Sequence, residues 1–361
     1  MHGPAKLFAA GGIYLLHEYS PAASIARANS PEKLKNIRRQ QPVANSSGRS
    51  ICPFGNKHCR PCKSHIKKGG LIIPFTRQRP VDQLTKYAYS QRMSQPTSCE
   101  LSVLDLVPFG QTGNESRFFA LRLTRPEWTK WRPGQFVMIR PQSFGLEIPW
   151  ARPLGICHMT ARHMICFFQV VGKGTKRMSE LRPGDRVRAW GPLGNGFVTE
   201  PDTPTLLLAG GMGIVPFVGY VSEHPKPWNV TMLFGHRESI SCYPVDSINE
   251  HVPLDSLRET VPGDLDNFIF SIQERMTEYA EQKGLVLACG PTPFMRTVQK
   301  FAAELGVRCQ LSLENRMACG VGACLGCVTK TTEAWPVPAK RGSQVQACNH
   351  GPVFWSDQIE L

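Results

Sequence analysis

Four cysteines near the end of the chain constrain its fold and chemistry more than any other feature. Cys319, Cys324 and Cys327 form a C-x4-C-x2-C loop, and Cys348 follows after twenty intervening residues. Three thiolates on one short loop, with a fourth from a later segment, are a ligand arrangement of [2Fe–2S] clusters. We therefore predict that these four cysteines are the metal ligands of an iron–sulfur centre.

Glycines separate these ligands. Gly320, Gly322 and Gly326 allow the loop to take positive φ and to turn its amides toward the cluster sulfurs. A structural zinc site is the alternative for the same cysteines. Zinc is usually held by paired knuckles of similar spacing rather than by three cysteines within nine residues, so the spacing favours the cluster. Because a cluster accepts one electron, the rest of the chain should contain whatever supplies or removes electrons.

Length and composition indicate a multidomain globular protein. The chain has 361 residues, 41% of them hydrophobic, which is enough for two or three domains with cores of their own. No apolar run approaches the roughly 20 residues that a membrane-spanning helix needs, so no membrane association is expected. Thirteen cysteines in a chain of this length do not indicate a disulfide scaffold. Thiols that stay available for iron fit a reducing compartment, and we predict a cytoplasmic protein.

The positive charge is concentrated in the first quarter of the chain. Residues 1–92 carry 16 of the 42 Lys and Arg residues but only 3 of the 28 Asp and Glu residues, so the remainder is close to neutral. This extension is expected to be disordered, because it is strongly basic and shows little helical or strand periodicity. Cys52, Cys59 and Cys62 could bind a metal there, and the basic side chains could contact phosphate. A solvated tail, or a stretch upstream of a protein that begins at Met93, is the favoured interpretation, and no nucleic-acid binding is expected of the core.

Residues 93–199 show the pattern of a small β-barrel. Short apolar or alternating segments are separated by turns such as Pro133-Gly134 and Pro183-Gly184. Strands at roughly ten-residue spacing with such turns between them are typical of barrels. The expected strands lie at 101–106, 118–123, 135–139, 156–159, 164–171 and 185–190.

The pattern changes again between 200 and 307. Thr205–Ala209 is an unbroken apolar strand, as in a parallel sheet covered on both faces. A glycine-rich turn and a helix follow it. Further strands are expected at 230–234, which ends at Gly235-His236-Arg237, and at 285–288, with a helix at 293–305. Strand, turn and helix repeated in this way predict a doubly wound α/β domain.

Several short motifs are candidates for nucleotide binding. Glycines after a buried strand allow a pyrophosphate to approach the backbone, and the following helix N-terminus offers free amides. Each motif also has a structural alternative. The glycines could form a tight packing turn, the cysteine could be a buried packing residue, and the arginine could form a surface ion pair. The candidates are Gly210, Gly211 and Gly213, then Cys289, Gly290 and Pro291, and in the barrel Arg152 with Gly174 and Thr175.

Set together, these motifs resemble the electron-transfer subunits of NAD-dependent dihydroorotate dehydrogenases, within the ferredoxin–NADP reductase superfamily. The resemblance covers the chain from about Met93 to Leu361 and is most specific at Ser312–Val328 and Gly351–Phe354. It implies a multidomain β and α/β protein. Its parts would be an FAD-binding antiparallel β-barrel at 93–199, an NAD-binding doubly wound α/β domain at 200–307 and a small C-terminal [2Fe–2S] domain at 308–361.

The resemblance also implies roles for individual residues, none of them catalytic. The FAD motif falls on Arg152, Pro153, Leu154 and Gly155, its adenine-side strand on Phe167, Phe168 and Gln169, and its Gly-Thr pair on Gly174 and Thr175. The NAD motifs fall on Ala209–Pro216, which includes Gly210, Gly211, Gly213 and Pro216, and on Cys289, Gly290 and Pro291. The cluster ligands are Cys319, Cys324, Cys327 and Cys348.

Four positions depart from the family pattern. Gly155 replaces a usual Ser or Thr and removes a hydroxyl expected to hydrogen-bond the flavin side. Gln169 stands where a basic residue is common, and Ala209 replaces the first glycine of the nucleotide loop. Glu333–Gly342 lengthens the segment before the fourth cysteine as an apparent hairpin insertion. Of these, only Gly155 is expected to affect an important property, the affinity or potential of the flavin.

The function implied by the resemblance is electron transfer in pyrimidine biosynthesis. An FMN-containing dihydroorotate dehydrogenase catalytic subunit would oxidise dihydroorotate, and electrons would reach NAD through the cluster and FAD. A flavin is needed because NADH carries two electrons and the cluster takes one. The assembly would be a heterotetramer with two of each subunit. The alternatives are a related reductase subunit serving a hydrogenase or a sulfide/ferredoxin complex, and a zinc-bearing, nucleic-acid-binding protein built on the basic extension.

Overall fold

The computed structural model describes residues 97–110, 116–128, 130–336 and 343–361. All of them belong to one compact unit that spans Asp82–Leu361. The predicted basic extension, with its three cysteines, lies outside the described residues. Within the described ranges, no helix is long and apolar enough to cross a membrane.

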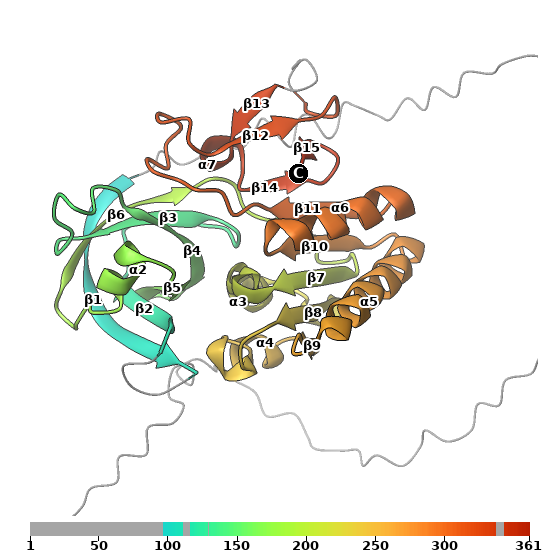
Figure 1. Ribbon diagram of the computed structural model, residues 1–361, viewed down its shortest axis with the longest axis horizontal. Helices are drawn as coiled ribbons and strands as arrows, with labels where there is room; N and C mark the ends of the chain where they lie inside the picture. The colour runs from blue at the N-terminus through green and yellow to red at the C-terminus, as the bar shows by residue number, and fades with distance from the viewer. Residues whose placement is uncertain (1–96, 111–115, 129, 337–342) are drawn as a thin grey trace, which may run out of the picture. The chain divides into compact units, whose positions relative to one another are not determined.

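The first part of the unit is a closed antiparallel barrel, as the alternating segments predict (Figure 1). The strands are hydrogen-bonded in the order β1-β2-β5-β4-β3-β6, so neither edge is left open to pair with another chain. Leu121, Ile139 and Ile156 are fully buried inside. The strands are β1 (Thr97–Phe109), β2 (Phe118–Thr124), β3 (Phe136–Pro141), β4 (Arg152–Met159), β5 (His163–Gln169) and β6 (Arg186–Leu193), and a short helix, α2 (Lys173–Met178), follows β5.

The second part is a six-stranded sheet in the order β14-β11-β10-β7-β8-β9. All neighbouring pairs are parallel except β14 with β11. The strands are β7 (Thr205–Gly210), β8 (Val230–His236), β9 (Leu254–Arg258), β10 (Leu285–Cys289), β11 (Arg308–Ser312) and β14 (Val353–Trp355). β11 and β14 therefore add to this sheet although they lie within 308–361.

Helices cover both faces of this sheet, which confirms the doubly wound prediction. Leu206 and Leu208 of β7 pack into one core with α5 (Pro262–Glu281) and α6 (Thr292–Leu305). Leu207 and Ala209, which point the other way, pack into a second core with α3 (Val215–Glu223). This alternation explains why β7 is apolar at every position. The short helix α4 (Asp246–Asn249) lies between β8 and β9 in the chain.

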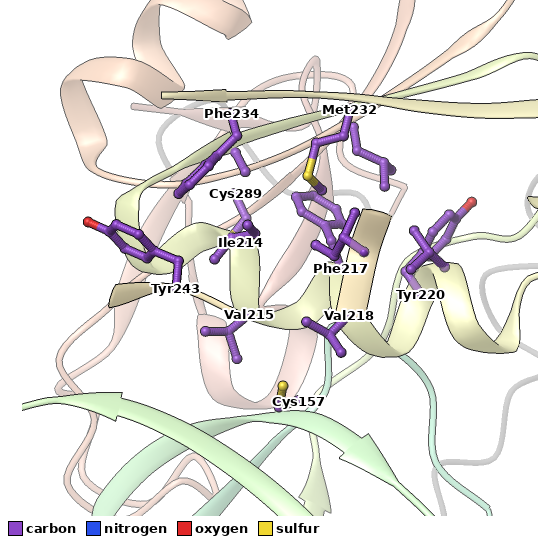
Figure 2. Packing of buried hydrophobic residues seen from close by; sticks show 14 of the residues in the cluster. Cys157, Ile214, Val215, Phe217, Val218, Tyr220, Met232, Phe234, Tyr243 and Cys289 are labelled. Atoms are coloured by element: carbon purple, nitrogen blue, oxygen red, sulfur yellow. The ribbon is translucent and has the colours of Figure 1, made fainter. Parts of the chain in front are cut away.

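Helix α3 also packs against the barrel. In Figure 2, Val215 and Val218 point toward Cys157 of β4, whereas Phe217 points toward Met232 of the sheet. A side chain at Gly219 would meet the Cys157 carbonyl at 2.8 Å, so only glycine allows the helix to lie this close. The barrel and the α/β sheet therefore share a core through α3.

The last part is a small sheet in the order β13-β12-β15. Its strands are β12 (Val328–Thr331), β13 (Gln344–Gln346) and β15 (Ile359–Glu360), and α7 (Ala347–His350) follows β13. β12 and β13 are antiparallel, so the segment between them connects two paired strands, as a hairpin insertion would. Residues 337–342 of that segment lie outside the described ranges.

Candidate functional site

The four predicted cluster cysteines come together in two pairs. The loop between β11 and β12 carries Cys319, Cys324 and Cys327, and α7 brings in Cys348. The Cys319 side chain lies near Cys324, whereas Cys348 lies nearest Cys327, with Cys319 acting on it more weakly. Cys327 and Cys348 are buried, Cys319 is half-buried and Cys324 is exposed. The site thus has a buried pair and a pair near the surface.

Backbone amides point at three of these sulfurs. The amide of Gly322 donates to Cys348 Sγ at 3.1 Å, and that of Gly326 to Cys324 Sγ at 3.5 Å. The amides of Val321 and Cys324 donate to Cys319 Sγ at 3.4 Å. Gly320 and Gly322 have φ of 73° and 80°, as predicted. At the third position only half of the prediction holds, because Leu325 (φ 56°) and not Gly326 takes the left-handed conformation, although the Gly326 amide does point at a sulfur. Amide donors stabilise thiolate charge, so the loop suits anionic sulfur ligands.

The electrostatics of the two pairs differ. The Gly326 amide and those near Cys319 lower the pKa of the exposed Cys324 thiol to about 7. Burial, followed by the neighbouring Cys327, raises the pKa of Cys348. The Cys324 thiol is therefore readily ionised, whereas Cys348 depends on a bound cation to hold its thiolate.

The pairwise arrangement bears on the two metals that the spacing left open. Within the described residues, no three His, Cys, Asp or Glu side chains converge as ligands of a single metal ion. A mononuclear zinc site built from cysteines alone requires four thiolates around one point. A two-iron cluster with four cysteine ligands takes two at each iron, which fits one exposed and one buried pair. The donor set therefore fits a [2Fe–2S] cluster.

The cysteine loop packs directly on the barrel. The indole Nε1 of Trp190 in β6 donates a hydrogen bond to the Cys319 carbonyl at 3.1 Å. A side chain at Gly320 would meet Met138 Cγ of β3 at 2.6 Å, so the loop backbone touches the barrel wall. Sequence reasoning missed Trp190, because its partner lies 129 residues further along the chain. This contact places a cluster site next to the domain expected to bind flavin.

In the barrel, the structure brings the predicted arginine and Gly-Thr turn together. The guanidinium of Arg152 lies so close to Gly174 that a Cβ there would overlap it. Thr175 Oγ1 accepts hydrogen bonds from the amides of Val171 and Gly172 at 2.9 and 3.2 Å and fixes the turn. Arg152 also lies over the Phe144 ring, 5.6 Å from its centroid. A cation beside glycine backbone is suited to bind a diphosphate.

The other predicted flavin residues have different surroundings. Phe167 and Phe168 are buried in separate cores, so their side chains are not available for a ligand. Gln169, at the end of β5, is half-buried, as are Pro153 and Gly155, whereas Leu154 is buried. A Cβ at Gly155 would meet only Val215 Cγ1, at 3.9 Å. There is therefore room at Gly155 for the side chain that the family pattern has.

The predicted nucleotide motifs meet at the carboxyl ends of β7 and β10. A Cβ at Gly213 would overlap the Cys289 carbonyl, and one at Gly290 would lie 3.1 Å from Gly210 Cα. Pro291 Cδ lies 3.0 Å from the Cβ position of Gly210, while that of Gly211 faces open space. Ligands of doubly wound sheets bind at this edge. Pro216 is buried in the first turn of α3. Burial raises the pKa of the Cys289 thiol, so this thiol stays neutral.

Comparison with known proteins identifies the family. Residues 314–360 match the model of the iron–sulfur cluster binding domain of dihydroorotate dehydrogenase B. The chain is 33% identical over 236 residues to the electron transfer subunit of dihydroorotate dehydrogenase B (NAD(+)) from Caldanaerobacter subterraneus subsp. tengcongensis, covering 64% of this chain and 90% of the relative. It is 31% identical to the Listeria monocytogenes serotype 4b subunit of the same name, covering 70% and 96%. The chain belongs to this family.

Membership confirms the predicted oxidoreductase subunit and favours the cluster over zinc for the cysteine loop. A solved chain of an NADH-dependent reduced ferredoxin-NADP oxidoreductase has the same fold, with a TM-score of 0.57 and 24% identity over 72% of this chain and 89% of that one. That likeness confirms the predicted combination of barrel and α/β sheet.

Proposed function

We propose that the chain is the electron-transfer subunit of an NAD-linked dihydroorotate dehydrogenase in pyrimidine biosynthesis. It would exchange electrons with an FMN-containing catalytic subunit through a [2Fe–2S] cluster and FAD. The family supports this role, since the relatives are named as electron transfer subunits of that enzyme. A cytoplasmic location and an assembly of two copies of each subunit are part of the proposal.

The observation that carries the proposal is the packing of the cysteine loop on the barrel. Trp190 fixes the Cys319 carbonyl, and Gly320 lets the loop touch β3 without an intervening side chain. Bound here, a cluster would supply one-electron chemistry and a flavin two-electron chemistry. The protein's part is to hold the two sites next to one another.

Each cofactor has residues suited to it. Arg152 and the Gly174-Thr175 turn would hold the FAD diphosphate, and Gly155 leaves an open space beside α3. The glycines of the β7 loop, together with Gly290, would take the NAD pyrophosphate. The four cysteines would hold the cluster, with their amide donors stabilising its negative charge.

The exposed side of the cysteine loop supports a partner that accepts or donates electrons there. Cys324 is exposed, and 58% of the Leu325 side chain is in contact with solvent. Val321 and Val328 of the same segment are also 44% and 39% exposed, and several apolar residues around an exposed ligand suit docking of another protein. The catalytic subunit is the partner that we propose.

The test is to purify the chain with its co-expressed catalytic subunit. Flavin and iron–sulfur bands in the visible spectrum, together with NAD reduction by dihydroorotate, are the expected results. A colourless protein would contradict the cofactor assignment. A coloured protein that reduces dyes with NADH but does not use dihydroorotate with its co-purified partner would favour the alternative reductase.

A further inference from the structure

Arg237 and Glu259 form an ion pair just beyond the ends of β8 and β9. The last residues of these strands, His236 and Arg258, are register partners in the parallel sheet. Arg237 and Glu259 come next in the two segments and therefore leave the same edge side by side. The Arg237 guanidinium donates to the Glu259 carboxylate twice, from Nε to Oε2 at 2.9 Å and from Nη2 to Oε1 at 3.1 Å.

This edge continues the glycine site. Gly210, in the predicted pyrophosphate turn, pairs with Gly235 of β8, two residues before Arg237. Phe268 of α5 lies against Gly235 and stacks on Phe294 of α6, with ring centroids 5.9 Å apart. Phe294 in turn lies 3.4 Å from the Cβ position of Gly210. Backbone and aromatic rings thus form a continuous surface from the glycine turn toward the charged pair.

In doubly wound domains, the position at the end of the second strand meets the ribose of a bound dinucleotide. An acidic residue there accepts a hydrogen bond from the ribose 2′-hydroxyl of NAD, whereas an arginine accommodates the 2′-phosphate of NADP. β8 follows the glycine turn and its helix, so it is this second strand. The chain carries one residue of each kind at this point, joined in a pair.

We propose that Glu259 makes this chain select NAD over NADP by occupying Arg237. The bidentate pair uses two donors on one edge of the guanidinium, which arginine would otherwise offer to a phosphate. The carboxylate also places a negative charge where the 2′-phosphate would sit, while its remaining lone pairs can accept the 2′-hydroxyl. The inference rests on the proposed function, because it assigns the nucleotide to the β7 loop.

The pair is positioned to meet a ligand. The Arg237 side chain is 77% exposed and that of Glu259 is 33% exposed, so neither is sealed in the core. Arg258 Nε donates to the Arg237 carbonyl at 3.1 Å, and the Glu259 amide donates to the His236 carbonyl at 2.8 Å. These bonds hold both backbones in place, so removal of the Glu259 charge should free the guanidinium without moving it away from the edge.

The test is Glu259→Gln in the complex with its partner subunit. Gln keeps the size of the side chain, removes the charge and cannot accept two hydrogen bonds in the same geometry. We expect the affinity for 2′-phospho-AMP, measured by calorimetry, to rise on the order of tenfold, as loss of a charge repulsion and gain of an arginine donor would give. Affinity for AMP should stay the same or fall. The ratio of kcat/KM for NADPH to that for NADH, measured with a dye acceptor, should rise in parallel.

Two further variants make the result specific. Glu274→Gln removes an exposed carboxylate from α5 and should leave both affinities unchanged. Arg237→Ala, added to Glu259→Gln, should abolish the gain for 2′-phospho-AMP. The inference is overturned if the gain in affinity for 2′-phospho-AMP persists without Arg237. It is also overturned if the NADPH-to-NADH ratio of kcat/KM in Glu259→Gln stays within twofold of the parent. In either case, retained NADH activity leaves the proposed function standing. A parent complex that binds neither AMP nor NADH would refute the proposed function itself.

Discussion

The cysteine loop and the glycine loops hold their expected ligands in different ways. At the cysteine loop, four side chains are the proposed donors and backbone amides support them, as the Gly322 amide supports Cys348 Sγ at 3.1 Å. At the nucleotide edge, the backbones of the two loops pack closely. There is no room for a side chain at Gly213 beside the Cys289 carbonyl, or at Gly290 beside Gly210. Replacing a cysteine should therefore affect ligand binding more than packing. At the nucleotide edge, by contrast, a substitution at a glycine should affect binding and packing together.

The largest effect is expected from the buried ligand pair. Cys348→Ser should abolish the visible and EPR signals of the cluster, because Cys348 is 1% exposed and water cannot easily take the place of its thiolate. NADH–dye activity should be partly retained, since the glycine loops do not contain this residue. Cys324→Ser should leave a larger residual signal, because water can reach that exposed position.

The control for these variants is Cys99→Ser on β1, a half-buried thiol outside the cysteine loop. It should keep the full cluster signal. A normal signal in Cys348→Ser would show that another residue is the fourth ligand. Loss of dye activity together with the cluster would contradict the separation between the two regions.

At the nucleotide edge, Gly213→Ala should affect binding and packing together. The new Cβ overlaps the Cys289 carbonyl, so the two loops must move apart. Overpacking of this kind typically costs about 1–3 kcal/mol of folding free energy. We expect at least a roughly tenfold rise in KM for NADH, equivalent to about 1.4 kcal/mol, with the cluster signal intact.

Gly263→Ala is the matched control, because nothing lies within 4 Å of the Cβ that it adds at the start of α5. Its KM should equal that of the parent, and its melting temperature should be the same or slightly higher, because Ala favours helix over Gly. If Gly213→Ala kept the parent KM, the loop contact would be packing alone and the nucleotide would have to bind elsewhere.

Between the two regions, Trp190→Phe tests the contact that joins loop and barrel. The substitution removes the N–H donor to the Cys319 carbonyl and keeps an aromatic ring. A net hydrogen bond is worth about 0.5–1.5 kcal/mol, so the cluster should be lost several-fold faster during incubation with a chelator. Trp228→Phe, at a side chain that is 71% exposed, should not change that rate. Equal rates in the two variants would show that the indole contact does not stabilise the site.

The same contrast explains how much could be predicted from sequence. The four cysteines have a distinctive spacing, so the sequence alone is enough to predict them as ligands, and the structure brings them together. The barrel and the strands β7, β8 and β10 were also visible, because apolar runs between glycine turns are local patterns. Contacts between distant segments left no such signal. Trp190 with Cys319, and Arg237 with Glu259, pair residues whose proximity depends on sheet order.

The elements of the α/β part that were not predicted include β9 and α5. β9 has only half-buried or exposed residues and carries charge, so it lacks the apolar run of a central strand. α5 buries only Ile272, Met276 and Tyr279 among its 20 residues, which leaves a weak apolar stripe. β9 is the edge strand of the sheet, and α5 leaves most of its residues partly or fully exposed, so tertiary contacts rather than hydrophobic pattern decide their structure. Glu259 of the Arg237–Glu259 pair directly follows β9.

The smallest effect is expected at Gly155, where a hydroxyl of the family pattern is missing. The backbone there is not left-handed, and an added Cβ would meet only Val215 Cγ1 at 3.9 Å, so Ser fits without strain. Gly155→Ser should slow FAD loss during dialysis by several-fold at most, as one hydrogen bond of about 0.5–1.5 kcal/mol allows. Gly155→Ala adds the same Cβ without the hydroxyl and should match the parent. Equal retention by Ser and Ala would place the flavin out of reach of this residue, and weaker retention by both would show that the open space beside α3 is occupied by the flavin itself.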